Sequence, residues 1–455
     1  LAFGESLTFV SLILPATVPI DDQYVRNELT RYLEDNWIPI IDQDVDGPHS
    51  LPLRLDNKNP TIGRYSATRR AARTIYLGSA PTKGTANRGI DDRHVKLGCT
   101  QPGESVATFG DALRRLVDHT TYLFSDQGRY WYDTHQNVAR TARDRAEQYS
   151  DEVVFEEVRR WIRKQQGQRG EFARVHAFPA SSAEVPDEKE TRLVILGPEA
   201  PYDNRSEESA ALHQAKEILD HRGESPRSYR NTLVFSVADA GRMEDLCAAV
   251  RAYLAWRSIE EDKAVLNLDE YQSRQAQRRR EDAERTIKQR VPEAYRWVLV
   301  PEQKNGDREL SWRALRLQGD GSLAVRVSKR LVNEQLLWTQ MGATILRLKL
   351  DEIPLWPDGH VSLAQLAEHF ARYLYLPRLR SPELLVRAAE DGLRQLNWEE
   401  DGFAYAEGFD EAKHRYRGQV AQGAHSVNLS GLLVKPAVAK TQIEEEQKEK
   451  APQSE

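Results

Sequence analysis

Two apolar runs in the middle of the chain set the strongest limit on its fold. Residues 192–197 read RLVILG and residues 231–239 read NTLVFSVAD, and neither run alternates polar with apolar residues. Near-continuous apolar runs are typical of strands covered on both faces, as in parallel sheets. Between and after them, apolar residues recur at helical spacing: Leu212, Ala215, Ile218, Leu219, Leu246, Val250, Tyr253 and Leu254. The pattern predicts a βαβα unit with a parallel strand pair, and therefore an α/β fold.

Composition limits the class of protein and its compartment. The chain has 455 residues, of which 40% are hydrophobic and 29% charged, as in a globular multi-domain protein. Cys99 and Cys247 are far apart and belong to no C-x-x-C pair, which indicates a reducing, cytoplasmic compartment and no thiolate metal site. The net charge of -6 excludes a globally basic nucleic-acid coat but allows a local basic face.

The apolar stretch near the start of the sequence does not resemble a membrane segment. Residues 7–20, LTFVSLILPATVPI, are too short for a membrane span and are interrupted by Pro15 and Pro19. Glu5 and the lack of a basic region before them also argue against a signal peptide. Because the chain begins without Met, we expect it to start inside a longer protein.

An arginine cluster precedes a short apolar run and a glycine-containing loop. The run TIYL, Thr74 to Leu77, predicts a buried strand, and the loop GSAPTKGT follows it. A P-loop reads G-x-x-x-x-G-K-[ST], but here Lys83 precedes Gly84, so the lysine occupies the position that needs a glycine. No clear helix follows to aim its N-terminus at a phosphate. The loop is therefore interpreted as a polar surface loop.

Two segments combine a helix with a β-hairpin signal, as a winged helix does. In the first, FGDALRRLVDHTTYLFSDQGRYWY, a helix with Leu113 and Leu116 on one face runs into two aromatic-rich strands joined near Gly128. Basic residues lie on the helix face away from the leucines and at the expected hairpin tip, and are candidates for DNA contact: Arg114, Arg115 and Arg129.

The second segment lies near the end of the chain. Ser362 and Gln365 form a capping box, and Ser381 with Pro382 begins another helix. Asp401-Gly402 between strand-like flanks predicts a tight hairpin. Because Glu399, Glu400 and Asp401 would make this wing acidic, we expect protein rather than DNA contact here.

Three other stretches are interpreted as structural or disordered segments without a functional role. Residues 269–290 form a polar helix with consecutive arginines, but acidic residues follow at once, so a solvated face is favoured over a nucleic-acid arm. Residues 346–352, LRLKLDE, alternate as a half-exposed strand does, which argues against a Mg²⁺-binding strand end. Residues 436–455 are expected to be a disordered tail. No G-x-S-x-G or H-E-x-x-H motif occurs, and no metal site is predicted.

Several long blocks, in order, resemble a known family. They are LPLRLDNKNPTIGRYSATRRAARTIYLGSAP, RGIDDRHVKLGCTQPGE, FGDALRRL, RYWYDT, FARVHAFP, YRNTLVFSVAD and DLCAAVRAYLAWRSI. Together they resemble a prokaryotic family of large AAA-type ATPases known as domain of unknown function 499. The similarity covers most of residues 20–300 and is weaker over 360–410. This chain departs from the family pattern because it contains no Walker A loop.

The resemblance implies a domain order and partners. It implies residues 1–80 as the C-terminal part of a P-loop ATPase core, 81–150 as a winged-helix-like lid, 151–300 as an α/β domain with a long polar helix, and 301–435 as a C-terminal winged-helix-like domain. ATP and Mg²⁺ would bind only in the full-length protein, and none would bind within this chain. A homo-oligomer is implied, with DNA and a DNA methyltransferase or helicase as further partners, and no membrane.

The resemblance also gives the arginine cluster a role. In AAA-type modules, an arginine that completes the neighbouring subunit's site often lies just before the last core strand. Arg69 and Arg70 are then candidates for a trans arginine finger, and Arg64 and Arg73 for residues near the nucleotide. The alternative is that these arginines only form salt bridges on a surface helix.

Two functions therefore stay open. The chain is either the C-terminal part of an anti-phage defence or restriction-like ATPase that acts on DNA, or a non-catalytic scaffold that binds protein partners.

Overall fold

The computed structural model describes residues 12–35, 37–80, 88–134, 137–164, 168–206, 208–266, 268–304, 309–352, 355–356 and 359–450. The chain forms two compact units, residues 1–149 with 252–281, and residues 150–251 with 282–455. The expected boundary at residue 150 coincides with a unit boundary. The boundaries expected near residues 80 and 300 do not coincide with a unit boundary. Residues on both sides of position 80 share one hydrophobic core, and strand β9 (Trp297–Glu302) crosses position 300.

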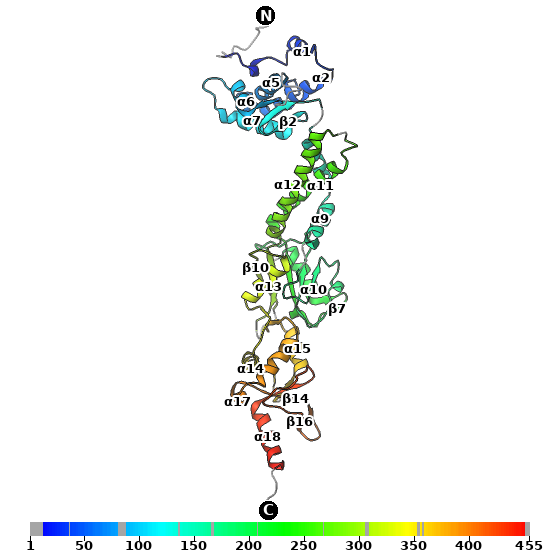
Figure 1. Cartoon of the computed structure of the whole chain (residues 1–455), viewed down its shortest axis with the longest axis vertical. Helices are drawn as coiled ribbons and strands as arrows, with labels where there is room; N and C mark the ends of the chain where they lie inside the picture. Colours follow the sequence, from blue (N-terminus) through cyan, green and yellow to red (C-terminus); the bar gives the residue numbers. More distant parts are fainter. Residues whose placement is uncertain are drawn as a thin grey trace, which may run out of the picture. The chain divides into compact units, whose positions relative to one another are not determined.

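The first unit is mainly helical and carries a small sheet. Its elements are α1 (Gln23–Thr30), α2 (Trp37–Ile40), a π-helical turn (Ile41–Val45), α3 (Leu51–Lys58), α4 (Pro60–Gly63), α5 (Ala67–Ser79), β1 (Ile90–Asp91), α6 (Asp92–Cys99), α7 (Val106–His119), β2 (Leu123–Asp126), β3 (Arg129–Tyr132) and α8 (Val138–Gln148). Figure 1 shows α5, α6 and α7 gathered beside β2. The sheet order is β1-β3-β2.

Helix α5 is the centre of this unit, and it corrects the strand predicted at TIYL. Ala67, Ala71 and Ile75 are all fully buried and recur every four residues, so they form one face of a helix. The four-residue apolar run is the last part of that helix. Consequently, the arginine cluster does not precede a core strand: Arg69, Arg70 and Arg73 lie on α5 itself, and Arg64 lies just before it.

The hairpin predicted in the first winged segment is confirmed. Strands β2 and β3 pair antiparallel from Leu123 with Tyr132 to Asp126 with Arg129, which leaves a two-residue turn. Gln127 has φ 47° and Gly128 has φ 76°, so both turn residues are left-handed, as a type I′ turn requires.

The second unit begins with a five-stranded mixed sheet. Its elements are α9 (Asp151–Lys164), β4 (Arg174–Ala177), β5 (Arg192–Ile195), α10 (Ala210–Asp220), β6 (His221–Arg222), β7 (Ser225–Pro226), β8 (Leu233–Val237), α11 (Ala240–Glu261), α12 (Glu270–Ala294), β9, β10 (Ser311–Arg316) and α13 (Leu323–Asn333). The strand order is β10-β9-β8-β5-β4. Strands β4, β5 and β8 are parallel, and β9 and β10 are antiparallel. The predicted βαβα unit is confirmed, and every residue of β5 and β8 is buried. The predicted polar helix is α12.

The rest of the second unit is a helical module with its own small sheet. Its elements are β11 (Leu337–Trp338), α14 (Ala343–Glu352), β12 (His360–Ser362), α15 (Leu363–Arg372), β13 (Arg378–Leu379), α16 (Glu383–Gly392), α17 (Trp398–Asp401), β14 (Ala404–Ala406), β15 (Gly408–Asp410), β16 (Arg415–Arg417), β17 (Leu432–Val434) and α18 (Pro436–Lys450). The main sheet of this module has the order β12-β17-β14.

Two strand predictions in this module are wrong. Residues 346–352 belong to helix α14, in which Leu346 and Leu350 are buried and Leu348 is 61% exposed. The Asp401-Gly402 hairpin is replaced by the helical turn α17, and β14 pairs with the distant β17. Gly402 does not have a positive φ. A glycine is needed at this position because a Cβ would lie 2.8 Å from the Trp398 Cα.

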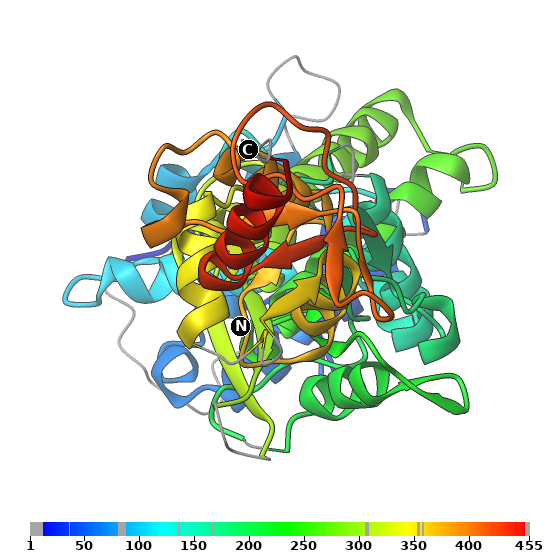
Figure 2. The same cartoon turned by 90° about the horizontal axis from the view of Figure 1, so that it is seen from below.

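The expected disordered tail is a helix over most of its length. Residues 436–450 form α18, in which Ala439 is fully buried beside Trp398 and Val434. Gln442 exchanges two hydrogen bonds with the backbone of Tyr416, at 2.7 and 2.9 Å. Figure 2 shows α18 in red lying against the orange strands of this module. The tail is ordered because these few buried contacts compensate for a polar composition; residues 451–455 lie outside the described part.

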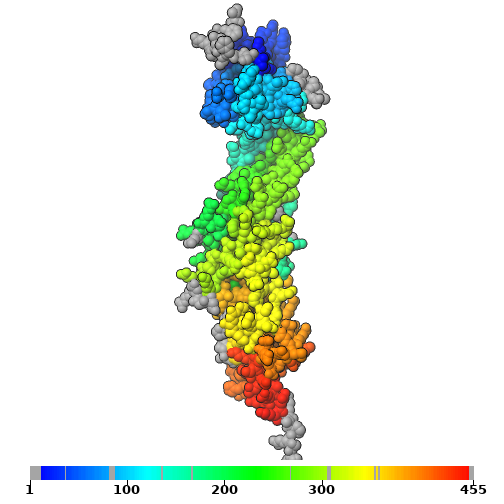
Figure 3. Space-filling model, turned by 90° about the vertical axis from the view of Figure 1, so that its left-hand side faces the viewer, coloured from blue at the N-terminus to red at the C-terminus, as the bar shows by residue number. Residues whose placement is uncertain are grey.

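Buried polar contacts join the sheet to the C-terminal module. The Thr191 hydroxyl donates to the Leu379 carbonyl at 2.6 Å, and the Asn231 amide donates to the carbonyls of Phe370 and Leu376 at 2.8 and 3.0 Å. In Figure 3 the yellow-green surface of the sheet's last strands continues into the yellow and orange surface of the C-terminal module. Among the described residues, no helix is both long and apolar enough to cross a membrane.

Candidate nucleic-acid interface

Arg69 and Arg73 lie one turn apart on α5 and share two carboxylates. The Arg69 Nε and Nη2 donate to Asp46 at 2.9 and 2.7 Å, and its Nη2 also reaches Asp21 at 3.2 Å. The Arg73 Nε donates to Asp46 at 2.5 Å, and its Nη2 to Asp21 at 2.9 Å. The Asp46 side chain is fully buried, and those of the two arginines are 21% and 13% exposed. These contacts are the salt bridges of the alternative interpretation, and the role of Arg73 near a nucleotide stays a prediction.

Arg70 is also held within the first unit. Its Nη1 donates to Glu104 at 2.8 Å, its Nη2 donates to the Cys99 carbonyl, and its guanidinium lies 5.0 Å from the Phe109 ring centre. Arg64 is exposed and lies over the ring of the adjacent Tyr65. The trans arginine finger therefore stays a prediction, and an acting Arg69 or Arg70 would first have to leave these partners.

Asp44 fixes the π-helical turn to the start of the β2–β3 hairpin. Its Oδ2 accepts from the backbone N–H groups of Thr121 and Tyr122, both at 2.6 Å, and its carbonyl accepts from the Tyr132 hydroxyl at 2.8 Å. Asp44 is fully buried, and its Oδ1 has no hydrogen-bond partner among the described residues. Burial raises the pKa of this carboxyl to about 6, although the two N–H groups lower it.

Asp44 predicts a pH-dependent stability of the first unit. Because the folded pKa of about 6 lies above the ordinary aspartate value of 3.8, the folded state binds the proton more tightly. The stabilisation of the folded state by this proton is complete below about pH 4 and is lost as the pH rises through 6. The free energy of unfolding falls by up to ~3 kcal/mol, because each pKa unit corresponds to 1.36 kcal/mol. Urea unfolding of the parent and of Asp44→Asn, followed from pH 4 to 7, should show this loss in the parent alone. A parallel pH response in both proteins would contradict this prediction. The control is Asp42→Asn, which makes the same change at a half-exposed neighbouring acid.

The three arginines predicted to contact DNA do not lie together. Arg114 is 78% exposed on α7 but pairs with Asp111 on the same face. The Arg129 guanidinium folds back from the hairpin and donates to the carbonyls of Arg88, at 3.0 Å, and Gly89. Arg129 is the first residue after the turn, as predicted for the hairpin tip, but these carbonyls hold its guanidinium, and its contact with DNA stays a prediction.

Arg115 instead faces helix α3, where it helps to form a basic groove. This α3–α7 groove has a volume of about 230 Å³ and is lined by Leu51, Arg54, Leu55, Lys58, Asn59, Arg115 and His119. Arg54, Lys58 and Arg115 are exposed and form no ion pair with any described residue, and none of the described lining residues is acidic. The groove combines three solvated cations with an apolar floor.

Of the three cations in this groove, the sequence had indicated Arg115 but not Arg54 or Lys58. Arg54 and Lys58 are four residues apart in LPLRLDNK, which places them on one helical face, so the spacing was a usable signal. Their proximity to Arg115 could not be derived, because it depends on how α3 packs beside α7. Residues 81–85 of the GSAPTKGT loop lie outside the described part of the chain, and Gly78 and Ser79 belong to helix α5 rather than to a loop.

Comparisons with known proteins give no further identification. No family model, no curated protein and no solved structure matches the chain. Within the described ranges, no group of three or more His, Cys, Asp or Glu residues could hold a metal ion.

Proposed function

We propose that the first unit is a winged-helix module that binds the phosphate backbone of double-stranded DNA through the α3–α7 groove. The observation that carries the proposal is the set of unpaired cations in this groove, beside the second helix of a helix-turn-helix pair, α6 and α7. In such pairs the second helix enters the major groove, and cations beside it contact phosphates.

The order of elements supports the winged-helix assignment. In the first unit it runs α5, β1, α6, α7, β2, β3, with β3 between β1 and β2. The C-terminal module has the similar order α14, β12, α15, α16, β14, β17, interrupted by β13, α17, β15 and β16, and with β17 between β12 and β14. A helix, a strand, two helices and a two-stranded wing are thus present twice.

The proposal predicts a salt-dependent loss of binding in a groove variant. Replacing Arg54, Lys58 and Arg115 by Gln removes three phosphate contacts, so the plot of log affinity against log salt should become shallower by about one for each cation. At low salt, affinity for a labelled duplex should fall about tenfold or more. The measurement is fluorescence anisotropy of the whole chain at several salt concentrations.

Two single variants distinguish DNA binding by the α3–α7 groove from binding by any exposed arginine of the unit. Arg31→Gln, at an exposed position of the same unit, should bind as the parent does. Arg114→Gln tests the outward face of α7, where Asp111 opposes phosphate. No binding by the parent, or equal slopes for the parent and the triple variant, would refute the proposal.

A protein-binding role is the second candidate, and it concerns the C-terminal module. Glu399, Glu400 and Asp401 lie in its helical turn α17, and all three are exposed. Their charge would repel phosphate, which favours a protein partner for this module.

The larger assembly is proposed from the sequence resemblance alone. We infer a homo-oligomeric AAA-type ATPase of a defence or restriction-like system, acting with a DNA methyltransferase or helicase in the cytoplasm. Because these 455 residues contain no Walker A motif, ATP and Mg²⁺ would bind in another part of the full-length protein. Finding G-x-x-x-x-G-K-[ST] in the coding sequence before Leu1 would support this assembly, and its absence there would refute it.

A further inference from the structure

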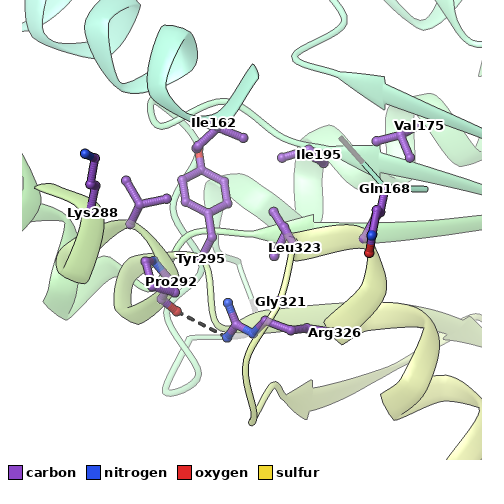
Figure 4. A pocket seen from close by; sticks show the side chains of 12 residues that line it. Ile162, Gln168, Val175, Ile195, Lys288, Pro292, Tyr295, Gly321, Leu323 and Arg326 are labelled. Atoms are coloured by element: carbon purple, nitrogen blue, oxygen red, sulfur yellow. Dashed lines mark hydrogen bonds between the residues drawn. The ribbon is translucent and has the colours of Figure 1, made fainter. Parts of the chain in front are cut away.

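A pocket in the second unit lies where α9, α12 and α13 meet the sheet. Its volume is about 190 Å³. Its walls are mostly apolar and are formed by Ile162, Val175, Ile195, Val291, Leu323 and Tyr295. Figure 4 shows Arg326 reaching across the pocket from α13 toward Pro292, near Tyr295 and Leu323.

Arg326 is buried but has few partners. It is 6% exposed, its Nη2 donates to the Pro292 carbonyl at 3.3 Å, and its Nε has no hydrogen-bond partner among the described residues. Asp320 acts on it through charge, but Asp320 is exposed and does not line the pocket. A guanidinium carries five N–H donors, so most of the hydrogen-bonding capacity of Arg326 is unused.

Arg227, in the same unit, shows how a structural arginine is satisfied. It is 5% exposed, and its guanidinium donates to the carbonyls of Ile218, Pro186 and Val185 at 2.8 to 3.0 Å. Arg326 has one such contact and borders a cavity. The difference points to a missing anionic partner in the pocket, because a buried charge without partners is costly.

We infer that this pocket binds a small monocarboxylate with an apolar body. The carboxylate would accept the unused N–H donors of Arg326 in a planar, two-point pairing. The apolar body would cover the walls formed by Ile195, Leu323 and Tyr295.

The lining residues favour this ligand over three alternatives. A phosphate dianion would meet one buried cation, since Lys288 at the edge is 54% exposed and already pairs with Glu284 at 2.9 Å. A neutral hydrocarbon would leave the guanidinium without an acceptor. Water could pair with Arg326 and Gln168, but it would leave the apolar walls uncovered.

Binding of defined probes to the whole chain tests the inference. Hexanoate and benzoate should bind and shift the methyl resonances of Ile195 and Leu323. Hexanol, acetate and inorganic phosphate, each lacking one half of the ligand, should bind about tenfold more weakly or not at all. Arg326→Met should weaken hexanoate about ten- to a hundredfold, as expected for a lost charge-assisted hydrogen bond.

Two further variants keep the test decisive. Arg330→Met makes the same change one turn along α13 at a residue that pairs with Glu334, and it should bind hexanoate as the parent does. Ala324→Leu fills the pocket while keeping Arg326, so it should block hexanoate even if Arg326→Met does not fold. Parent protein that ignores both carboxylates, or binds hexanol or phosphate equally well, overturns the inference. So does hexanoate binding that is unchanged in folded Arg326→Met or in Ala324→Leu.

Discussion

Replacing Arg227 by Met is expected to destabilise the second unit by about 3–5 kcal/mol, because three carbonyls lose their donor at about 1–3 kcal/mol each. Arg227 joins the C-terminal end of α10 to the segment around Val185 through main-chain carbonyls that no other described side chain reaches. Met fills a similar volume but donates no hydrogen bond, so these carbonyls would stay buried without a partner. Urea unfolding, read from hydrogen exchange of β5 and β8, reports this unit directly.

Arg222→Met is the matched control for Arg227. Arg222 lies five residues earlier and is exposed in β6, so its replacement should change the free energy of unfolding by less than about 0.5 kcal/mol. Arg227→Lys keeps the charge but lacks the planar fork, and it should fall between the parent and Met. A Met variant as stable as the control would show that the carbonyls find other donors.

Asp46→Asn is expected to destabilise the first unit by about 3 kcal/mol, near the lower end for breaking a buried ion pair. Arg69 and Arg73 would lose their shared buried charge, the amide NH2 group would face a guanidinium, and the one remaining carboxylate would be Asp21, which is 46% exposed. Urea unfolding read from the amides of α5 measures the change. Asp42→Asn, at an acid that pairs with Arg26 on a more exposed surface, should cost about 1 kcal/mol or less.

The same network separates the structural and catalytic roles of Arg69. If the role is structural, Arg69→Ala lowers the free energy of unfolding of this chain. If Arg69 acts in trans on a phosphoryl group, Arg69→Ala in the full-length assembly slows turnover by about 10³-fold or more while unfolding changes little. A destabilised variant with normal turnover would leave only the structural role.

The helical spacing of α10 and α11 extends over 11 and 22 residues, so only a helix fits it. The runs at β5 and β8 are short, but they are apolar at nearly every position and are joined by helix α10, which favours buried parallel strands. The β2–β3 hairpin held because its turn residue Gly128 suits the left-handed conformation that the turn requires.

The predictions that failed were read from short windows. TIYL and LRLKLDE each look extended over four to seven residues, yet Leu346 and Leu350 also fit one face of a helix, and tertiary packing chose the helix. Asp401-Gly402 had the right residues for a tight turn, but burial of Trp398 favoured a helical turn before it.

Only part of the candidate site could be predicted from the sequence. Arg115 was identified, but its companions Arg54 and Lys58 come from a helix far away in the chain. For the same reason, the acids that hold Arg69 and Arg73 could not be assigned from spacing. Long-range packing, rather than local pattern, decides which charges meet.

The discontinuous first unit has a consequence for synthesis. Val138 and Ala142 on α8 share a buried cluster with Ala255, Ile259 and Ala276, so the ribosome must make residues 150–251 before this cluster can close. At roughly 5–20 residues per second, the apolar face of α8 waits many seconds without its partners. A fragment ending at residue 149 would expose that face permanently and should aggregate, whereas one that restores residues 252–281 through a short linker should stay monomeric.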